Sequence, residues 1–340
     1  MAITLRILSV AWECPSEPYG GLGVFISRLL PEMTRDFEVT HYCLYGYSRL
    51  VYSFHGARVI RVHEPLVDRG GGVLVLTSIA LGGELMRVVP LFDVLISHDV
   101  HGSLVVACGR ELGVRSIYYV HTWTFTPLDV MGALSASRVL CNSEFTASQI
   151  KSTVNIDVKV VYPASPYPLV VDRPNKPGGD KRVIVIPSRW QDNKSPRYVI
   201  NALGEVRKRF KLEVVVFGRG AELYELPSWV INAGTVSEEE KLKLYRRADL
   251  VLQVGFPEPF GLVALEAISQ GAPTLVSNQS GVAEVLPGEA VYSLDNIVEK
   301  ITQYLDDNSL REELWFKERD SWIMKRTWRD VWSEVKSELK

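Results

Sequence analysis

Two glutamates on either side of a glycine turn are the groups in this sequence best suited to bind a phosphorylated sugar. Glu258 and Glu266 lie around a Pro-Phe-Gly turn that follows an apolar run. A helix beginning near Gly261 would point the backbone N–H groups of Phe260, Gly261 and Leu262 at an anion, along with the positive end of the helix dipole. The two carboxylates could accept hydrogen bonds from hydroxyl groups. This segment therefore predicts a site that holds a phosphate and a polyol together.

Two cations follow an earlier apolar run. Arg189 and Lys194 lie five residues apart on the loop after Arg182–Ile186. A diphosphate leaving group gains negative charge as its bond to a sugar breaks, and fixed cations stabilise that charge. The loop therefore indicates a diphosphate as the anion.

These two motifs resemble those of the retaining glycosyltransferases of the two-domain GT-B class. The closest resemblance is to family 4, the large family that includes glycogen, starch and sucrose synthases. Glu258 and Glu266 match its Glu-x7-Glu motif, and the loop with Arg189 and Lys194 matches its Arg-x4-Lys loop. The resemblance implies that Glu258 holds hydroxyls of the donor sugar and Glu266 the ribose. It implies that Arg189 and Lys194 stabilise the diphosphate.

A glycine-rich segment near the start of the chain adds to the resemblance. The loop from Pro18 to Gly23 resembles the Gly-Gly-Leu segment that closes over the donor phosphates in glycogen and starch synthases. By this resemblance, Gly21, Leu22 and Gly23 are predicted to bind the donor. Pro18 stands where bacterial glycogen synthases carry Lys, so their donor preference does not carry over. A nicotinamide cofactor is disfavoured, because Ile26 occupies the third glycine position of the dinucleotide fingerprint.

Two segments of the second half are further candidates for the donor site. Gly218 ends a strand pattern and permits close backbone approach to a ligand. Val236 lies in a segment similar to the family's Gly-x-Val loop, whose backbone commonly meets the nucleotide base. The side chains of Ser237 and Glu240 are explained by a helix capping box, without any function.

Histidines cluster at predicted strand ends in the first half. His121 matches a family histidine that lies beside the donor sugar and the reaction centre. His98 and Asp99 belong to a segment similar to the family's His-Asp-x-His. We predict no catalytic metal, because His98 and His101 lack an evident third ligand and the chain has no Asp-x-Asp motif. The predicted catalytic residues are Glu258, His121, Arg189 and Lys194.

Aromatic residues in neighbouring loops could form a platform for the acceptor, because sugar rings present apolar C–H faces. Packing beneath the loops is an equal alternative for each of them, including Phe125. The predicted acceptor-binding residues are Trp12, Tyr19, His98, Asp99 and Trp123.

Short apolar strands alternate with amphipathic helical stretches in both halves of the 340-residue chain. The expected strands include 6–11, 94–97, 212–217 and 274–277, and a helix is expected over 74–88. This alternation indicates parallel α/β sheets covered on both faces. Two Rossmann-like, doubly wound domains facing a central cleft, as in the GT-B fold, are expected. The predicted bounds are 1–165 for an acceptor-binding domain, 166–181 for a linker, 182–315 for a nucleotide-sugar-binding domain and 316–340 for a terminal helix. By resemblance, that helix crosses back onto the first domain.

Composition limits the possible partners and the compartment. The formal net charge is −2, so we expect no binding to nucleic acid, and no apolar run is long enough to span a membrane. The four cysteines form no Cys-x-x-Cys pair, which favours buried reduced thiols and weakly predicts a cytoplasmic location. A membrane-surface role for the terminal segment is an alternative to packing, because Trp322, Trp328 and Trp332 could form an interfacial band.

The motifs together predict a retaining hexosyltransferase that moves a hexose, glucose by preference, from a nucleotide-diphosphate sugar to a hydroxyl of a glycan or small sugar. The donor is a UDP-, ADP- or GDP-hexose, and no cofactor is expected. One alternative is another GT-B enzyme, such as a sugar-nucleotide epimerase or a glycan phosphorylase. The other is a non-catalytic sugar-nucleotide-binding subunit. The acceptor, the donor base and the oligomeric state are left open.

Overall fold

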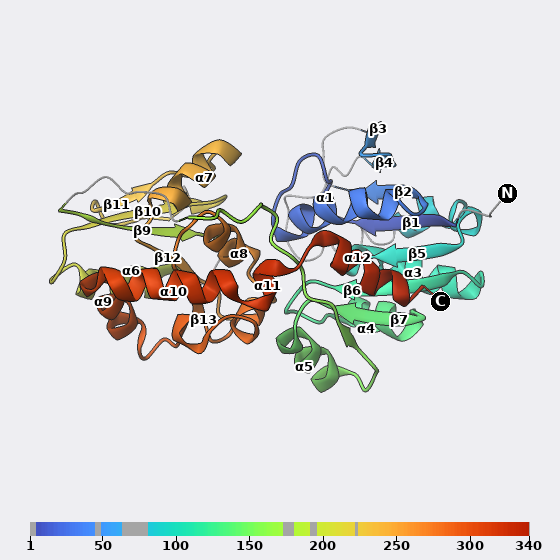
Figure 1. Cartoon of the computed structure of the whole chain (residues 1–340). Coiled ribbons are helices and arrows are strands. Elements are labelled where there is room, and N and C mark those ends of the chain that lie inside the picture. Colours follow the sequence, from blue (N-terminus) through green and yellow to red (C-terminus); the bar gives the residue numbers. More distant parts are fainter. Residues whose placement is uncertain are drawn as a thin grey trace. The chain divides into compact units, whose positions relative to one another are not determined.

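The computed structural model describes residues 5–44, 49–62, 81–172, 180–190, 196–221 and 224–339. It divides into two compact units (Figure 1). Unit 1 takes in the described residues of Met1–Pro163 and Thr327–Lys340, and unit 2 those of Ala164–Arg326. The predicted site residue Lys194 lies outside the described residues, as does the first part of a helix expected over 74–88.

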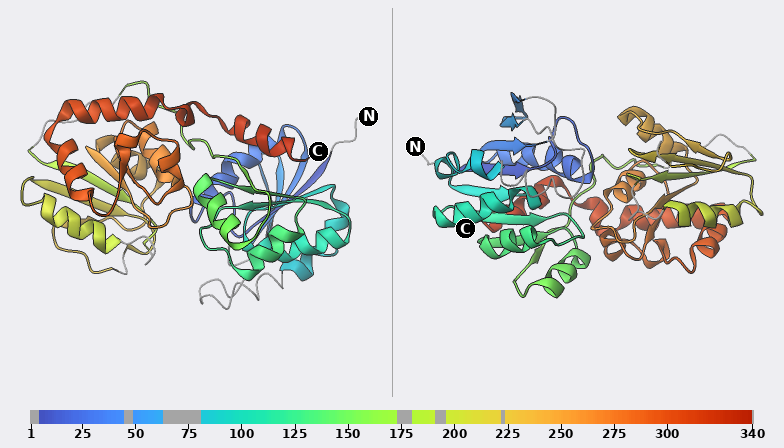
Figure 2. Two further views of the ribbon diagram at one scale, coloured as in Figure 1. Left: turned by 90° about the horizontal axis from the view of Figure 1, so that it is seen from below. Right: turned by 180° about the vertical axis from the view of Figure 1, so that it is seen from behind.

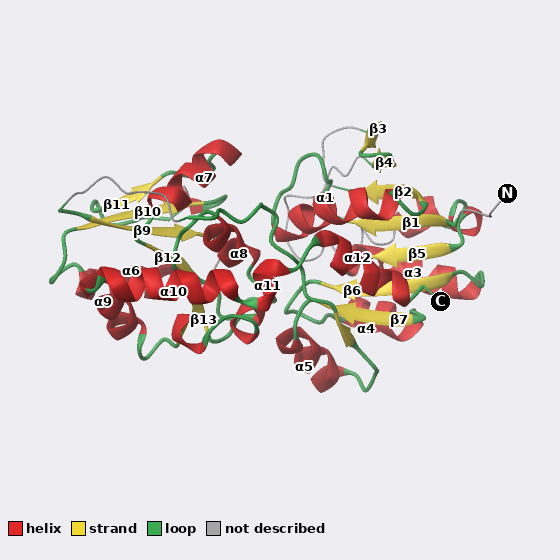
Figure 3. Ribbon diagram, viewed as in Figure 1, coloured by secondary structure: helices red, strands yellow, loops and turns green. Residues whose placement is uncertain are grey.

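Unit 1 is built on an eight-stranded sheet in the order β3-β4-β2-β1-β5-β6-β7-β8 (Figure 3). Its neighbouring strands run parallel, except that β3 is antiparallel to β4. The strands are β1 (Arg6–Ala11), β2 (Glu38–Cys43), β3 (Leu50–Phe54), β4 (Ala57–Arg61), β5 (Val94–Ser97), β6 (Arg115–Val120), β7 (Arg138–Cys141) and β8 (Lys159–Val160).

Helices cover both faces of this sheet. They are α1 (Gly21–Thr34), α3 (Ser103–Glu111), α4 (Pro127–Ser135), α5 (Glu144–Thr153) and α12 (Trp328–Ser337), with short 3-10 helices η1 (Val89–Leu91) and η2 (Val100–Gly102). On one face, Leu8 and Val10 of β1 share a core cluster with Val105 of α3, Ala133 of α4 and Ile150 of α5. On the other face, α12 lies beside α1 (Figure 2).

Unit 2 holds a parallel six-stranded sheet in the order β11-β10-β9-β12-β13-β14. Its strands are β9 (Arg182–Pro187), β10 (Leu212–Phe217), β11 (Val230–Asn232), β12 (Leu250–Gln253), β13 (Thr274–Ser277) and β14 (Val291–Tyr292). Its helices are α6 (Pro196–Val206), α7 (Glu238–Arg247), α8 (Leu262–Ser269), α9 (Ile297–Asp306), α10 (Asn308–Asp320) and α11 (Trp322–Lys325), with 3-10 helices η5 (Gly281–Glu284) and η6 (Gly288–Ala290). A core cluster joins α7 and α8 to the sheet through Tyr245, Ala267 and Val215.

The order in which successive strands are added to each sheet reverses at a switch point. This point lies between β1 and β5 in unit 1 and between β9 and β12 in unit 2. Ligands of open α/β sheets bind outside the carboxyl ends of the strands at such points. The segments that follow these four strands begin at Trp12, His98, Ser188 and Val254. Predicted site residues lie on all four segments, so the topology gathers them at one edge of each sheet.

The last described segment belongs to unit 1, whereas α10 and α11 stay with unit 2. The return therefore begins at Thr327 and not at residue 316. Asp36 anchors it by accepting hydrogen bonds from Arg329 Nη2 at 3.0 Å, Trp332 Nε1 at 2.8 Å and Lys336 Nζ at 3.1 Å. The bond from Arg329, aided by the other two donors, lowers the pKa of the Asp36 carboxyl.

A membrane-facing band of the three tryptophans is not what this segment forms. Trp332 is fully buried, and the ring of Trp328 packs against that of Phe25 at 5.2 Å between centroids. Of the three, Trp322 alone is exposed, at 51%. No helix in the described part of the chain is long and apolar enough to cross a membrane.

A disulfide joins Cys14 and Cys43, so the expectation of reduced thiols is wrong for this pair. The two cysteines are 29 residues apart in sequence, too far for a local motif. The parallel register of β1 and β2 explains the pairing, because it places Cys43 opposite Ala11, three residues before Cys14. Among the described residues, Cys108 and Cys141 are not in a disulfide. The cytoplasmic location loses part of its basis and stays a prediction.

Candidate active site

The N-terminus of α8 supplies amide groups at the predicted phosphate position. Gly261 caps the helix with φ 102° and ψ 55°, in the left-handed region that glycine adopts without strain. Within the part of the chain that the structure describes, no hydrogen bond uses the N–H groups of Gly261 or Leu262. These amides and the helix dipole can therefore act on an anion.

Glu258 is held just before this helix end by backbone contacts. Its N–H donates to Gln279 O at 2.9 Å, and its carbonyl accepts from Gly281 N–H at 3.1 Å. Gly255 leaves room for the side chain, because a Cβ there would lie 2.7 Å from Glu258 Cβ and 3.0 Å from Oε2. The position of this carboxylate is thus set by the backbone around it.

Glu266 lies within α8 and is buried. Its Oε2 accepts a hydrogen bond from Tyr245 Oη at 3.1 Å and pairs with Lys241 Nζ at 3.3 Å. Burial raises the pKa of Glu266, although Lys241 opposes that effect. Neither partner was predicted, although their four-residue spacing on α7 places them on one helix face.

Arg189 follows β9, and Lys194 of the same predicted loop lies outside the described residues. Gly218 has a packing role within the protein, and its contact with a donor stays a prediction. With φ 128°, it allows its loop to approach the Ser188 backbone, where a Cβ would lie 1.9 Å from Ser188 O. Its N–H donates to Gly234 O at 2.7 Å. Its close approach therefore packs two loops of the protein against each other, which leaves Arg189 next to a fixed backbone.

Val236 precedes α7, and its side chain packs against the core cluster of unit 2. The predicted capping box is confirmed: Ser237 Oγ accepts from Glu240 N–H at 3.2 Å, and Glu240 Oε2 accepts from Ser237 N–H at 2.9 Å. A contact between the backbone of Val236 and a nucleotide base stays a prediction.

The glycine loop of unit 1 is organised by a residue that the sequence analysis did not single out. Glu13 Oε2 accepts hydrogen bonds from the N–H groups of Tyr19 at 2.9 Å, Gly20 at 2.6 Å and Gly23 at 2.9 Å. Of the three predicted donor contacts here, the amide of Gly23 is thus already used by the protein. In the described structure the amides of Gly21 and Leu22 make no hydrogen bond.

His98 and His121 lie in an aromatic cluster beneath α1. The ring of His121 lies 4.3 Å from that of Tyr119 and 4.5 Å from that of Phe25, between centroids. Burial lowers the pKa of His121 to about 3, and burial together with His121 lowers that of His98 well below its ordinary value. Both imidazoles are therefore neutral near pH 7. His121 Nε2 and His98 Nδ1 have no hydrogen-bond partner among the described residues.

Asp99 is a structural anchor in the folded chain. Its Oδ2 accepts from Trp12 N–H at 2.5 Å and its Oδ1 accepts from His101 N–H at 2.9 Å, which caps η2. Burial would raise the pKa of Asp99, but His101 and these amides lower it on balance. Trp12 and Tyr19 make an edge-on contact at 5.0 Å. Trp123 is 36% exposed, and an acceptor platform of these aromatics stays a prediction.

Phe125 is partly buried and packs against the core cluster of unit 1, as does Trp12. In the described residues, no group of three or more His, Cys, Asp or Glu side chains could hold a metal ion.

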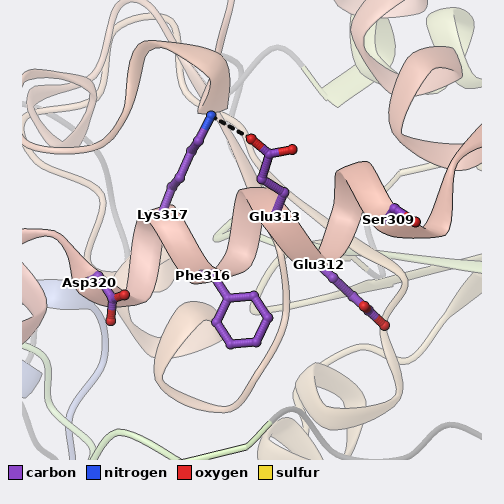
Figure 4. A pocket seen from close by; sticks show the side chains of 6 residues that line it. All are labelled: Ser309, Glu312, Glu313, Phe316, Lys317 and Asp320. Atoms are coloured by element: carbon purple, nitrogen blue, oxygen red, sulfur yellow. Dashed lines mark ion pairs between the residues drawn. The ribbon is translucent and has the colours of Figure 1, made fainter.

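A shallow hollow lies along α10, and Figure 4 shows the ion pair there between Lys317 and Glu313, at 2.9 Å. None of the predicted site residues lines this hollow, so we assign no donor site to it.

Two glycosyltransferase family models match this chain, one in each half. Residues 171–319 match the family model described as Glycosyl transferases group 1, and residues 19–165 match that described as Glycosyltransferase Family 4. An uncharacterized glycosyltransferase of Methanocaldococcus jannaschii is 22% identical over 97% of this chain and 97% of its own. A glycogen synthase of Mycobacterium tuberculosis is 25% identical over 83% of this chain and 80% of its own.

The fold has a close counterpart among solved structures. The Anabaena protein HepE, solved in complex with UDP and glucose, superposes with a TM-score of 0.77 at 14% identity, covering 98% of this chain and 99% of its own. This likeness confirms the predicted GT-B architecture of two parallel-sheet α/β units. How the units face each other stays a prediction. The matched families, the relatives and the fold identify the chain as a glycosyltransferase with the GT-B fold, related to glycosyltransferase family 4.

Proposed function

We propose that this glycosyltransferase moves glucose from a nucleotide-diphosphate glucose to a hydroxyl of a glycan or small sugar, with retention of the anomeric configuration. The observation that carries the proposal is the N-terminus of α8, where Glu258 and Glu266 flank the unbonded amides of Gly261 and Leu262. Glucose and a diphosphate donor are supported by the likeness to a glycogen synthase and to a protein solved with UDP and glucose.

In the proposed reaction, the acceptor oxygen forms a bond to C1 of the sugar on the face from which the diphosphate departs. The bond between C1 and the diphosphate oxygen breaks, and the departing diphosphate takes the acceptor's proton. The amides of Gly261 and Leu262, with Arg189 and Lys194, stabilise the negative charge that develops on the diphosphate.

The carboxylates and His121 have binding roles in this proposal. Glu258 accepts hydrogen bonds from sugar hydroxyls, and Glu266 accepts them from the ribose. Since the pKa of His121 is lowered to about 3, its imidazole is neutral near pH 7 and would lie beside the sugar as an uncharged ring. No step requires a metal ion or a cofactor.

A thermal-shift titration tests donor binding. We would titrate the wild-type protein and Lys194→Ala with UDP-, ADP- and GDP-glucose, using Lys208→Ala, an exposed lysine of unit 2, as the control. A ligand that binds the folded state alone at 100 times its Kd stabilises it by about 2.7 kcal/mol. We expect one donor to raise the melting temperature of the wild type and the control but not of Lys194→Ala. A wild type that responds to none of the three would contradict the proposal.

Product analysis tests the chemistry. With the donor that binds, a panel of sugar acceptors and proton NMR of the new glycosidic linkage would report the anomeric configuration. We expect a product with the configuration of the donor. An inverted linkage would refute retention while leaving glycosyl transfer intact. Product formed without an acceptor would point to an epimerase, and a requirement for inorganic phosphate to a phosphorylase.

A further inference from the structure

A buried carboxylate occupies the glycine loop of unit 1 before any ligand binds. Glu13 is 3% exposed, and one of its oxygens, Oε2, accepts all three loop amides, from Tyr19, Gly20 and Gly23. An anion at a helix N-terminus is stabilised by the amides and the dipole. Here the protein supplies that anion from its own sequence.

The chain on both sides of Glu13 is fixed. The N–H of Trp12 donates to Asp99 Oδ2 at 2.5 Å, which ties the preceding residue to the segment after β5. The following residue, Cys14, is bonded to Cys43 at the end of β2. The carboxylate is thus carried by a backbone that is tied to the strands on either side of β1.

The loop is also shaped to fit the carboxylate. A Cβ at Gly23 would lie 2.5 Å from Glu13 Oε2 and 2.8 Å from Pro18 Cα, so a larger residue could not keep this arrangement. The amides of Gly21 and Leu22 are left without a partner among the described residues. The hydrogen bonds of Glu13 therefore divide the loop amides into an internal set and a free set.

We infer that Glu13 is a positioning residue, which holds the glycine loop in the shape that presents the amides of Gly21 and Leu22 to a donor phosphate. The inference rests on the proposed function, because the phosphate belongs to the nucleotide-diphosphate donor. Glu13 acts through the loop and does not touch the donor itself. Without this carboxylate, three amides would compete for the same phosphate and the loop would lose its anchor.

Two variants separate the position of the carboxylate from its presence. Glu13→Ala removes it, and Glu13→Asp keeps the charge but withdraws it by one methylene. The control is Asp129→Asn, a buried carboxylate of the same unit that accepts from Thr126 N–H at 2.8 Å and Tyr118 Oη at 2.6 Å. Isothermal titration with UDP, ADP and GDP, and with UMP, AMP and GMP, would give the affinities, and melting temperatures would report folding.

We expect Glu13→Ala and Glu13→Asp to bind the nucleoside diphosphate preferred by the wild type about tenfold more weakly. This loss is about the size of one hydrogen bond to a charged group. The matching monophosphate should lose less, and Asp129→Asn should lose thermal stability but keep its diphosphate affinity. If Glu13 had a purely structural role, its variants would lose affinity for the diphosphate and the monophosphate equally. If Glu13→Ala does not fold, the Asp variant decides the matter.

The outcomes separate the inference from the proposed function. Diphosphate affinity of folded Glu13→Asp within twofold of the wild type would overturn the inference alone. An equal loss for diphosphate and monophosphate would also overturn it. A wild type that binds none of the six nucleotides would overturn the proposed function, and the inference with it.

Discussion

Two helices of this glycosyltransferase begin after glycines at the carboxyl edge of a parallel sheet, yet their N-termini differ in what they hold. At α1, Glu13 accepts three amides of the loop, and two further amides remain. At α8, the amides of Gly261 and Leu262 are unbonded within the described structure. Unit 1 therefore shapes its loop around an internal anion, whereas the helix end in unit 2 keeps its amides unbonded within the described structure.

This difference predicts unequal shares in donor binding. At α8, the amides of Gly261 and Leu262 lie next to Glu258 in the chain. At α1, Glu13 already binds three amides, and only those of Gly21 and Leu22 remain. Changes at α8 should therefore reduce turnover more than changes at α1.

The strongest test of the α8 end is Glu258→Gln. Removing a preorganised contact that acts in the transition state typically costs about 10²–10³ in rate. We expect a loss of this size in kcat with little change in melting temperature, measured with the donor that the wild type uses. Glu299→Gln, on the exposed face of α9, is the matched control and should retain full activity. Near-normal turnover of Glu258→Gln would remove α8 from its leading role.

The anchoring of the α1 side can be broken at the disulfide. A double variant, Cys14→Ser with Cys43→Ser, should lower the free energy of unfolding by about 2–4 kcal/mol. Urea denaturation followed by tryptophan fluorescence would measure it, with Cys108→Ser as the control because that thiol is free. The glycine loop should bind donor more weakly in the double variant, because Cys14 adjoins Glu13. An unchanged unfolding midpoint would show that the bond contributes nothing to the fold.

A glycine variant tests the left-handed backbone at the start of α8. Gly261→Ala forces a side chain into the left-handed region at φ 102°, which costs roughly 1–2 kcal/mol, and its Cβ would lie 3.3 Å from Val282 Cγ1. We expect up to a tenfold rise in donor KM. Gly204→Ala in α6 meets nothing within 4 Å and should be neutral or slightly stabilising. Equal behaviour of these two variants would argue against a special backbone at Gly261.

The smallest effect concerns the support of Glu266. Tyr245→Phe removes one hydrogen bond to the carboxylate and should cost about 1 kcal/mol of stability. The pKa of Glu266 is raised in the folded state by burial, so its contribution to stability is retained at low pH and lost as pH rises above the ordinary value of 4.5. Losing Tyr245 raises that pKa further. The stability difference between wild type and variant should therefore be larger at pH 8 than at pH 4, and the reverse order would refute this account.

Most strands of the two sheets were predictable because their sequences are continuous apolar runs. The strands β1, β5, β10 and β13 have the bounds expected from sequence. The helix α4 was missed, although Thr126, Pro127 and Asp129 carry a capping box with proline at the first turn. The strand β3 was missed too, because it pairs on the sheet edge and its burial is partial.

The segments of the candidate site could be placed from the sequence, but the internal contacts of its residues could not. Motif spacing locates Glu258 and Glu266 because both are set by one local turn. No spacing connects Glu13 to the glycine loop, or Cys14 to Cys43, since both contacts depend on how β1, β2 and α1 pack. The same limit applies to the packing of Gly218 against the Ser188 carbonyl, which no sequence spacing indicates.

The return of α12 to unit 1 bears on the order in which the chain acquires its structure during synthesis. Unit 2 consists of the single stretch Ala164–Arg326, but unit 1 also requires Thr327 and the residues after it. A ribosome therefore produces every residue of unit 2 before it produces those that complete unit 1. Until then Asp36 lacks Arg329, Trp332 and Lys336, and the side of α1 that α12 covers is open to solvent. The contacts that complete unit 1 therefore become available only after the whole of unit 2 has been synthesised.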